Sequence, residues 1–282
     1  MICPGAGAVA VSCQGNVALA KATRRRSAGP GQGLITVVQF DPARTRLVLH
    51  AGSVEPIPGR VWRHGALISA VERGSLVAVF NGGFKIKDSR GGWRSEGRTV
   101  VPLVTRAASV VIYIDGGTDI GAWGWDVPQA GRPVASVRQN LELLIDRGRP
   151  QHAQPVAQPL LNQWWGHALR EQQLISRSAL GVTATGALVW AAGTRITVAA
   201  LGSALLTHGV VRALELDVNA PLVRGFLLPN PNHVIVTIGS HLVTTALPLV
   251  IGQTQTVVRP PNAQHCTYRD ACTRDYFTVL TR

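Results

Sequence analysis

A row of polar residues near position 215 is the part of this 282-residue chain best suited to chemistry. Glu215, Asp217 and Asn219 occupy every second position, and the residues between them are apolar. Because successive side chains of a β-strand point to opposite faces, the pattern predicts a strand with all three polar groups on one face. Such a row is typical either of the solvated face of an edge strand or of a surface that binds a ligand.

Two carboxyl groups as close as those of Glu215 and Asp217 repel each other when both are charged. One of them is then expected to keep its proton near neutral pH and to act as a general acid, with the other as base. Alternatively, a divalent cation such as Ca²⁺ or Mg²⁺ would neutralise both, because these ions prefer carboxylate and amide oxygens. The spacing does not choose between an acid–base pair and a metal site.

Three other positions have residue types that suit a binding or catalytic site. Asn81 ends an apolar run and precedes Gly82 and Gly83, so this is either a loop whose amides face a ligand or a glycine turn capped by Asn. Arg177 precedes another apolar run, and its planar guanidinium suits a phosphate or carboxylate, although a surface Arg is the alternative. Glu96 lies in a polar, glycine-rich loop, either as an acid or as an exposed loop residue.

The elements that would position these residues are mostly short strands. Thirty glycines and 17 prolines imply many turns, which favours a strand-rich fold. Apolar runs and alternation predict strands over 34–40, 45–50, 76–80, 110–115, 119–125, 179–183, 187–192 and 210–219. The short polar links after the first and fourth of these strands favour hairpins, and Asp115 is expected to be a turn residue in the second hairpin.

Helical periodicity is present in two segments. Residues 60–73 place Val61, Leu67 and Val71 on one side, and Gly74 would end that helix. Residues 197–208 begin at Thr197, a good N-cap, and present an apolar stripe. We therefore expect an α+β fold, a single mixed domain with a large sheet of short strands flanked by a few helices.

Composition sets the domain organisation and excludes some classes of protein. Residues 1–32 are rich in Ala and Gly and are expected to be a flexible leader or the remnant of an anchor, followed by one domain over 33–282. Hydrophobic residues make up 46% of the chain, which excludes wholesale disorder. No apolar run approaches about 18 residues, so a transmembrane helix is not expected.

The net charge of +13 comes almost entirely from Arg. An Arg excess fits a GC-rich coding background, and it also fits affinity for polyanions such as phosphate-bearing glycans. The arginines are scattered apart from the run Arg24-Arg25-Arg26, and no nucleic-acid motif is present, so nucleic acid is not an expected partner.

Four segments, in order, resemble motifs of the phosphodiester glycosidase family (uncovering-enzyme-like domain). They are residues 77–84 (VAVFNGGF), 138–146 (RQNLELLID), 177–183 (RSALGVT) and 213–217 (ALELD). The family often continues its Leu-Asp motif with several glycines and a Ser. Leu216-Asp217-Val218-Asn219 stands here instead and resembles a divergent, actinobacterial-type branch.

The resemblance implies a secreted or cell-envelope glycoside hydrolase that acts on a sugar phosphodiester or a related envelope or exopolysaccharide glycan. No cofactor is implied beyond a possible divalent cation, Ca²⁺ or Mg²⁺. The implied acid–base groups are Asp217, Glu215 and Glu96, and the implied substrate-binding residues are Asn81, Gly82, Gly83, Arg177 and Asn219. The alternative is a non-catalytic envelope protein that binds a glycan or another polyanion.

Cys266 and Cys272 flank a five-residue loop, and we predict a disulfide between them. The chain-entropy model gives a loop this short roughly 2–3 kcal/mol of stabilisation. A zinc site fits less well because the second pair of ligands is missing, and two reduced thiols are the remaining alternative. The Cα atoms of a bonded pair should lie within about 7 Å in an ordered structure, and a clearly larger separation would contradict the prediction.

Overall fold

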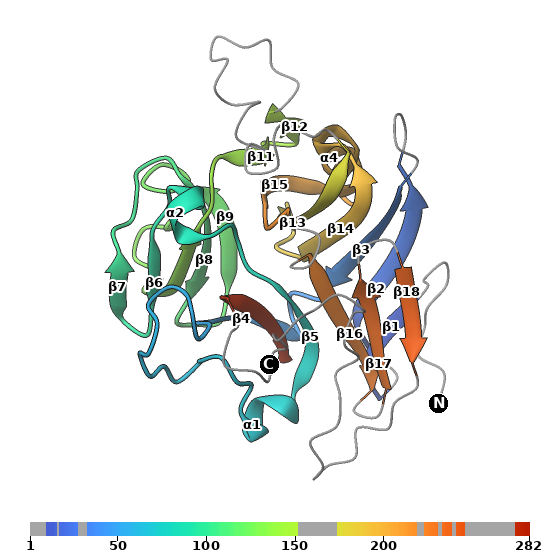
Figure 1. Ribbon diagram of the computed structural model, residues 1–282, viewed down its shortest axis with the longest axis horizontal. Helices are drawn as coiled ribbons and strands as arrows, with labels where there is room; N and C mark the ends of the chain where they lie inside the picture. The colour runs from blue at the N-terminus through green and yellow to red at the C-terminus, as the bar shows by residue number, and fades with distance from the viewer. Residues whose placement is uncertain are drawn as a thin grey trace.

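The computed structural model describes residues 10–15, 17–27, 33–151, 174–218, 223–230, 233–238, 241–245 and 274–282. These residues form three β-sheets whose neighbouring strands are antiparallel. In Figure 1 the five-stranded sheet lies on the left and the eight-stranded sheet on the right, with β4 (Thr45–His50) and β5 (Leu76–Asn81) between them. The helices in the described part of the chain are α1 (Ala70–Arg73), α2 (Ile86–Ser89) and α4 (Val198–Leu206).

The eight-stranded sheet contains the strands that carry Arg177 and Glu215. Its members are β1 (Ala10–Gln14), β2 (Val17–Arg26), β3 (Leu34–Phe40), β11 (Leu143–Asp146), β12 (Arg149–Pro150), β13 (Ile175–Thr183), β14 (Leu188–Ile196) and β15 (Val210–Glu215). Their order across the sheet is β1-β2-β3-β14-β13-β15-β11-β12. β15 therefore lies inside the sheet, between β13 and β11.

The other two sheets are assembled from strands far apart in the sequence. The six-stranded sheet has the order β18-β17-β16-β5-β19-β4, and the five-stranded sheet has the order β7-β6-β10-β8-β9. Their remaining strands are β6 (Trp93–Ser95), β7 (Arg98–Val101), β8 (Ala108–Tyr113), β9 (Thr118–Ala122), β10 (Val134–Gln139), β16 (Arg224–Asn230), β17 (His233–Ile238), β18 (His241–Thr245) and β19 (Tyr276–Thr281). The single large sheet that we expected is thus divided into three.

Phe80 lies at the centre of the main hydrophobic core, between the sheets. Its ring centroid is 6.2 Å from that of Phe40, 5.8 Å from that of Trp190 and 5.6 Å from that of Phe277. Ile120 of the five-stranded sheet belongs to the same cluster of buried side chains. This shared core brings the ends of strands from all three sheets close together.

α4 covers the opposite face of the eight-stranded sheet, as the sequence predicted. The Thr197 hydroxyl oxygen accepts a hydrogen bond from the Ala200 amide at 3.1 Å and so caps the helix. Leu201 and Leu205 are fully buried against that face. Gly209 follows the helix with a φ of +74°, a conformation that favours glycine.

The β8–β9 hairpin is also confirmed, with Asp115 in its turn. The Asp115 carboxylate accepts a hydrogen bond from the Gly117 amide at 2.7 Å. The hairpin expected between residues 34–40 and 45–50 is wrong, because β3 pairs with β2 and β14 whereas β4 pairs with β19. The chain leaves one sheet for another at this turn.

The helix expected over 60–73 is wrong except for its last turn, α1. Val61, Leu67 and Val71 are 89%, 59% and 87% exposed, so they do not form a buried stripe. These few apolar residues have helical spacing, but they do not pack against a buried surface, and residues 60–69 form turns and bends. α1 begins at a capping box in which Ser69 and Glu72 bond each other's backbone amides.

Within residues 1–32, which we expect to be a flexible leader or an anchor remnant, the described residues include two strands, β1 and β2. β1 and β2 pair with each other, and β2 pairs with β3 along Ala20–Arg26. Asn219, Cys266 and Cys272 lie outside the described residues, so their predicted roles stay predictions. Within the described residues, none of the helices has the length and apolar character needed to cross a membrane.

We predict that Leu201→Ala lowers the free energy of unfolding by about 2–5 kcal/mol, because it leaves a cavity beneath α4. Leu67→Ala is the matched control, since this leucine is 59% exposed and its truncation should cost less than about 0.5 kcal/mol. Chemical denaturation of the three proteins measures both values. Equal stability of Leu201→Ala and the parent would show that the α4 stripe is not packed on the sheet.

Candidate functional site

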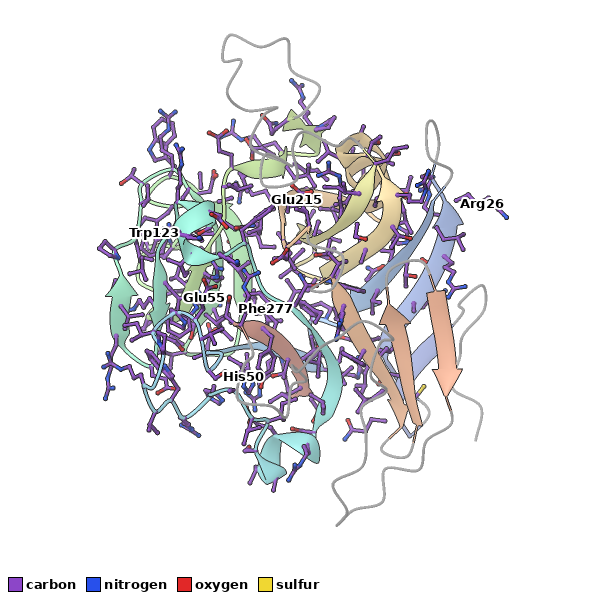
Figure 2. The ribbon with its side chains drawn as sticks, viewed as in Figure 1. Arg26, His50, Glu55, Trp123, Glu215 and Phe277 are labelled. Atoms are coloured by element: carbon purple, nitrogen blue, oxygen red, sulfur yellow. The ribbon has the colours of Figure 1, made fainter. Side chains whose placement is uncertain are left out.

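Buried charged groups gather where strand ends of all three sheets meet. β5 and β19 meet β15 there, since the Gly82 amide donates to the Asp275 carbonyl at 3.1 Å and the Asp217 amide donates to the Gly82 carbonyl at 3.3 Å. The Leu216 amide donates to the Ser178 carbonyl of β13 at 2.8 Å. Figure 2 labels Glu215 and Glu55, two carboxylates of this region. We call the charged groups at this junction the junction network. Its members are Arg177 with Glu215, Arg274 with Asp217 and Glu55, and Arg138 with Asp275.

Arg177 and Glu215 form the ion pair of the junction network that lies within the eight-stranded sheet. Glu215 is opposite Ala179 in the β13–β15 register, so Arg177, two residues along, lies on the same face. The Arg177 Nη1 to Glu215 Oε1 distance is 2.7 Å, and both side chains are almost fully buried. Glu215 is therefore not on the solvated face of an edge strand, which was one of our two interpretations.

The second carboxylate oxygen of Glu215 is buried and has no hydrogen-bond partner. Burial raises the pKa of the Glu215 carboxyl, and the Arg177 guanidinium opposes part of that rise. An acid in such a place holds its proton more readily than an exposed one does. Glu215 has the environment of a proton donor.

Arg274 connects Asp217 to the rest of the junction network. Its guanidinium pairs with the Asp217 carboxylate, lies 3.2 Å from Glu55 Oε2 and donates to the Gly83 carbonyl at 2.7 Å. The Arg274 side chain is 13% exposed, compared with 4% for Arg177. The positive charge nearest to solvent in the junction network is thus held by two carboxylates and one carbonyl.

Arg138 and Asp275 form a third ion pair, with Nε and Oδ2 2.6 Å apart and both side chains 1% exposed. Arg138 also donates to the carbonyls of Phe84 and Gln139. The Arg138 guanidinium therefore has a structural role. It joins β10 of the five-stranded sheet to Asp275, the residue that precedes β19.

Gly82 and Gly83, predicted to bind substrate, make room for these ion pairs. A Cβ atom on Gly82 would lie 2.5 Å from the Asp275 carbonyl oxygen, which no side chain allows. A Cβ atom on Gly83 would lie 3.1 Å from the Arg138 guanidinium carbon and from the Asn140 amide carbon. The Asn-Gly-Gly sequence is thus explained by close packing of charged groups against the backbone.

Asn81 cross-links three strands. Its side-chain amide donates to the Ser178 hydroxyl at 2.9 Å and to the Gly82 carbonyl at 3.0 Å, and its oxygen accepts from the Arg224 amide at 3.3 Å. The Ser178 hydroxyl in turn donates to the Asp217 carbonyl at 2.9 Å. These contacts bring Asn81, predicted as a site residue, next to β13 and Asp217, while contact with a substrate stays a prediction.

Glu96 lies apart from these contacts, in the turn between β6 and β7. Its φ is +51°, and its carboxylate accepts a hydrogen bond from the His64 amide at 2.9 Å. Glu96 therefore lies away from the junction, in the β6–β7 turn of the five-stranded sheet. The other predicted residues that the structure brings to the junction are Asn81, Arg177, Glu215 and Asp217.

Sequence reasoning missed part of the junction network. Arg138 and Asn140 lie in the segment 138–146, which resembles a family motif, but the sequence does not single out either of them as a site residue. Asn140 accepts from the Phe84 amide at 3.1 Å and donates to the Glu215 carbonyl. Arg274 and Asp275 directly precede the apolar strand β19, and charged residues at the end of a buried strand were the signal that could have found them.

The junction network offers anion-binding and acid–base chemistry. Its arginines can bind phosphate or carboxylate groups, and its carboxyl groups differ in environment, since Glu215 is enclosed and Asp217 is paired with the more accessible Arg274. Arginine partners already balance Glu215 and Asp217, so charge balance does not require a Ca²⁺ or Mg²⁺ ion between them.

Comparison with solved structures gives a full-length match. The catalytic domain of zebrafish N-acetylglucosamine-1-phosphodiester alpha-N-acetylglucosaminidase, auto-inhibited by its pro-peptide, aligns with a TM-score of 0.55 and 15% identity, covering 97% of this chain and 87% of that chain. This chain shares the fold of a phosphodiester glycosidase. A hypothetical protein from Synechocystis aligns with a TM-score of 0.43 and 14% identity over 93% of this chain and 62% of that one.

Sequence comparison adds nothing to this structural likeness. No protein-family model matches the chain, and no curated protein matches it either. At 15% identity the zebrafish domain shows the fold alone, so the chemistry must be argued from the residues of the junction network.

We predict that Arg138→Met lowers the free energy of unfolding by about 3–5 kcal/mol, because Asp275 would keep a buried charge without its partner. Arg44→Met is the control, since the Arg44–Asp41 pair is exposed and should contribute less than about 1 kcal/mol. Urea denaturation of both variants and the parent measures the difference. Similar losses in both variants would contradict the proposed importance of the buried pair.

Proposed function

We propose that this chain is a glycoside hydrolase that acts on a sugar phosphodiester or a related glycan of the cell envelope or an exopolysaccharide. The observation that carries the proposal is the gathering of buried arginines and carboxyl groups at one junction of strand ends. The likeness in fold to a domain that acts on an N-acetylglucosamine-1-phosphodiester supports the choice of substrate class. A secreted or envelope location is part of the same proposal.

The arginines would stabilise the phosphate that leaves. When the glycosidic bond to phosphate breaks, negative charge grows on the phosphate oxygens, and fixed guanidinium groups lower the energy of that charge. Arg274 is the most accessible arginine of the junction network, and its partners Asp217 and Glu55 hold it in place before substrate binds. Arg177 lies deeper, and when Glu215 holds its proton the Arg177 guanidinium contributes a positive charge behind the site.

The two carboxyl groups would divide the acid and base roles. Asp217 is paired with Arg274, and an ion pair favours the charged form, which suits a base or a nucleophile. Glu215 has its pKa raised by burial, which suits a proton donor. Glu96 bonds the His64 amide elsewhere and has no part in this mechanism, whereas Asn81 and Asn219 are proposed to orient sugar hydroxyls.

We predict that Asp217→Asn lowers turnover of an N-acetylglucosamine-1-phosphodiester by about 10²–10⁴-fold, the usual contribution of a general acid or base. The substitution keeps the side-chain volume and leaves Arg274 paired with Glu55, so ligand affinity and melting temperature should change much less. Asp115→Asn is the matched control, because this aspartate lies in the β8–β9 turn and its side chain is 59% exposed. Its turnover should equal that of the parent.

Two results would overturn parts of the proposal. Equal rates for Asp217→Asn and the parent, both above background, would remove Asp217 from the mechanism. No turnover of any member of a panel of sugar-1-phosphodiesters by the parent, together with measurable glycan affinity that falls on mutation, would support a binding protein instead of a hydrolase.

A further inference from the structure

His50, His64 and Glu72 form a second polar cluster, separate from the proposed acid–base groups. Each residue has a possible metal-ligand atom, and these atoms all lie within 4.8 Å of one another. Among the described residues this is the one such group of three or more histidine, cysteine or acidic side chains. His50 ends β4, Glu72 lies in α1, and His64 comes from the irregular segment between them.

The surroundings of His50 orient its ring. Nδ1 lies 3.1 Å from the Gly65 carbonyl, and because a carbonyl oxygen only accepts, the ring proton belongs on Nδ1. The lone pair of Nε2 then faces the cluster, 3.4 Å from Glu72 Oε1 and 3.1 Å from the Thr278 hydroxyl. The ring stacks on Tyr276 with centroids 4.6 Å apart, so the orientation is fixed by packing as well. Figure 2 labels His50 among these side chains.

Glu72 is oriented by the capping box of α1. Its Oε2 accepts from the Ser69 amide at 3.0 Å and from the Ser69 hydroxyl at 2.8 Å. Its other oxygen, Oε1, faces both rings and lies 2.8 Å from His64 Nδ1. A histidine that donates its second nitrogen to a carbonyl, and a carboxylate whose second oxygen is hydrogen-bonded, are the supporting contacts found around metal ligands.

We propose that His50 Nε2, His64 Nδ1 and Glu72 Oε1 bind a divalent first-row transition ion, with Zn²⁺ the best match. Two imidazole nitrogens and one carboxylate oxygen are a common zinc donor set. Bonds of about 2.0–2.2 Å in tetrahedral geometry place the ligand atoms roughly 3.3–3.6 Å apart. The two separations from Glu72 Oε1, 2.8 Å and 3.4 Å, need only small adjustments to reach that spacing.

The ion would be reached from the side of His64. The His64 side chain is 25% exposed, whereas His50 is fully buried and Glu72 is 9% exposed. Three protein ligands leave a fourth position for water on that side. The Glu96 carboxylate, through its bond to the His64 amide, helps to hold this ligand in place.

The proposed ion would tie down a long segment without helix or strand. Residues 51–69 run between β4 and α1 and present Val61 and Leu67 to solvent. Ligands at His50, His64 and Glu72 would fix the segment at both ends and near its middle. If the ion binds the folded chain and not the unfolded chain, it stabilises the folded state by mass action.

The test uses the full chain without a histidine tag, stripped with a chelator and titrated calorimetrically with ZnCl₂. We expect one equivalent of tightly bound zinc and a higher melting temperature with zinc than with chelator. His64→Ala should weaken this binding by at least about 100-fold, since even residues that only support a ligand contribute about 10–100-fold. Glu72→Gln should weaken it too, and Gln also suits the capping box.

His208→Ala is the matched control, because the His208 ring bonds Thr23 and the Ala204 carbonyl and lies outside the cluster. Its zinc affinity should equal that of the parent. The proposal is overturned if the parent binds no zinc equivalent, or if His64→Ala, still folded by melting temperature, keeps the parent affinity. In either case His64 and Glu72 form an ordinary hydrogen-bonded pair.

Discussion

Pairing of buried charge is the constraint on which the centre of this structure depends. An isolated charge removed from water costs several kcal/mol, so each buried guanidinium must find carboxylate or carbonyl oxygens with good geometry. The Arg138–Asp275 and Arg177–Glu215 pairs satisfy that requirement across strands that are 137 and 38 residues apart in the chain. The Arg138–Asp275 pair also links the five-stranded sheet to the six-stranded sheet, whereas the Arg177–Glu215 pair links neighbouring strands of the eight-stranded sheet.

That constraint explains why the strand ends are so closely specified. Gly82 and Gly83 leave space that side chains would fill, and Asn81 and Asn140 supply hydrogen bonds where the backbones of different sheets converge. Groups held in this way need little rearrangement when a charged ligand arrives, which is the property that electrostatic catalysis uses. The same contacts that stabilise the fold would therefore prepare the site for an anionic substrate.

The His50–His64–Glu72 cluster differs from the junction network in the chemistry of its side chains. The junction network joins three sheets and pairs guanidinium groups with carboxylates. The cluster joins neighbouring parts of the chain and places two imidazole rings beside one carboxylate. Arginines already neutralise the carboxylates of the junction network, so no metal ion is needed there for charge balance, whereas two imidazoles and an oriented carboxylate are a donor set that suits a metal ion. Two polar groups of one chain thus suit opposite kinds of ligand.

The sequence by itself determined the local elements and several residues of the candidate site. Period-two and helical patterns, with the Thr197 cap and the Asp115 turn, specify β5, β15, α4 and the β8–β9 hairpin, because these depend on neighbours in the chain. Only the tertiary structure decided that the strands divide into three sheets, that β3 and β4 separate and that residues 60–69 form turns and bends instead of a helix. The tertiary structure alone also shows that Asp217 pairs with Arg274 and that Arg138 pairs with Asp275. These partners are distant in the sequence, and a charged residue in a linear sequence does not indicate which opposite charge will be buried beside it.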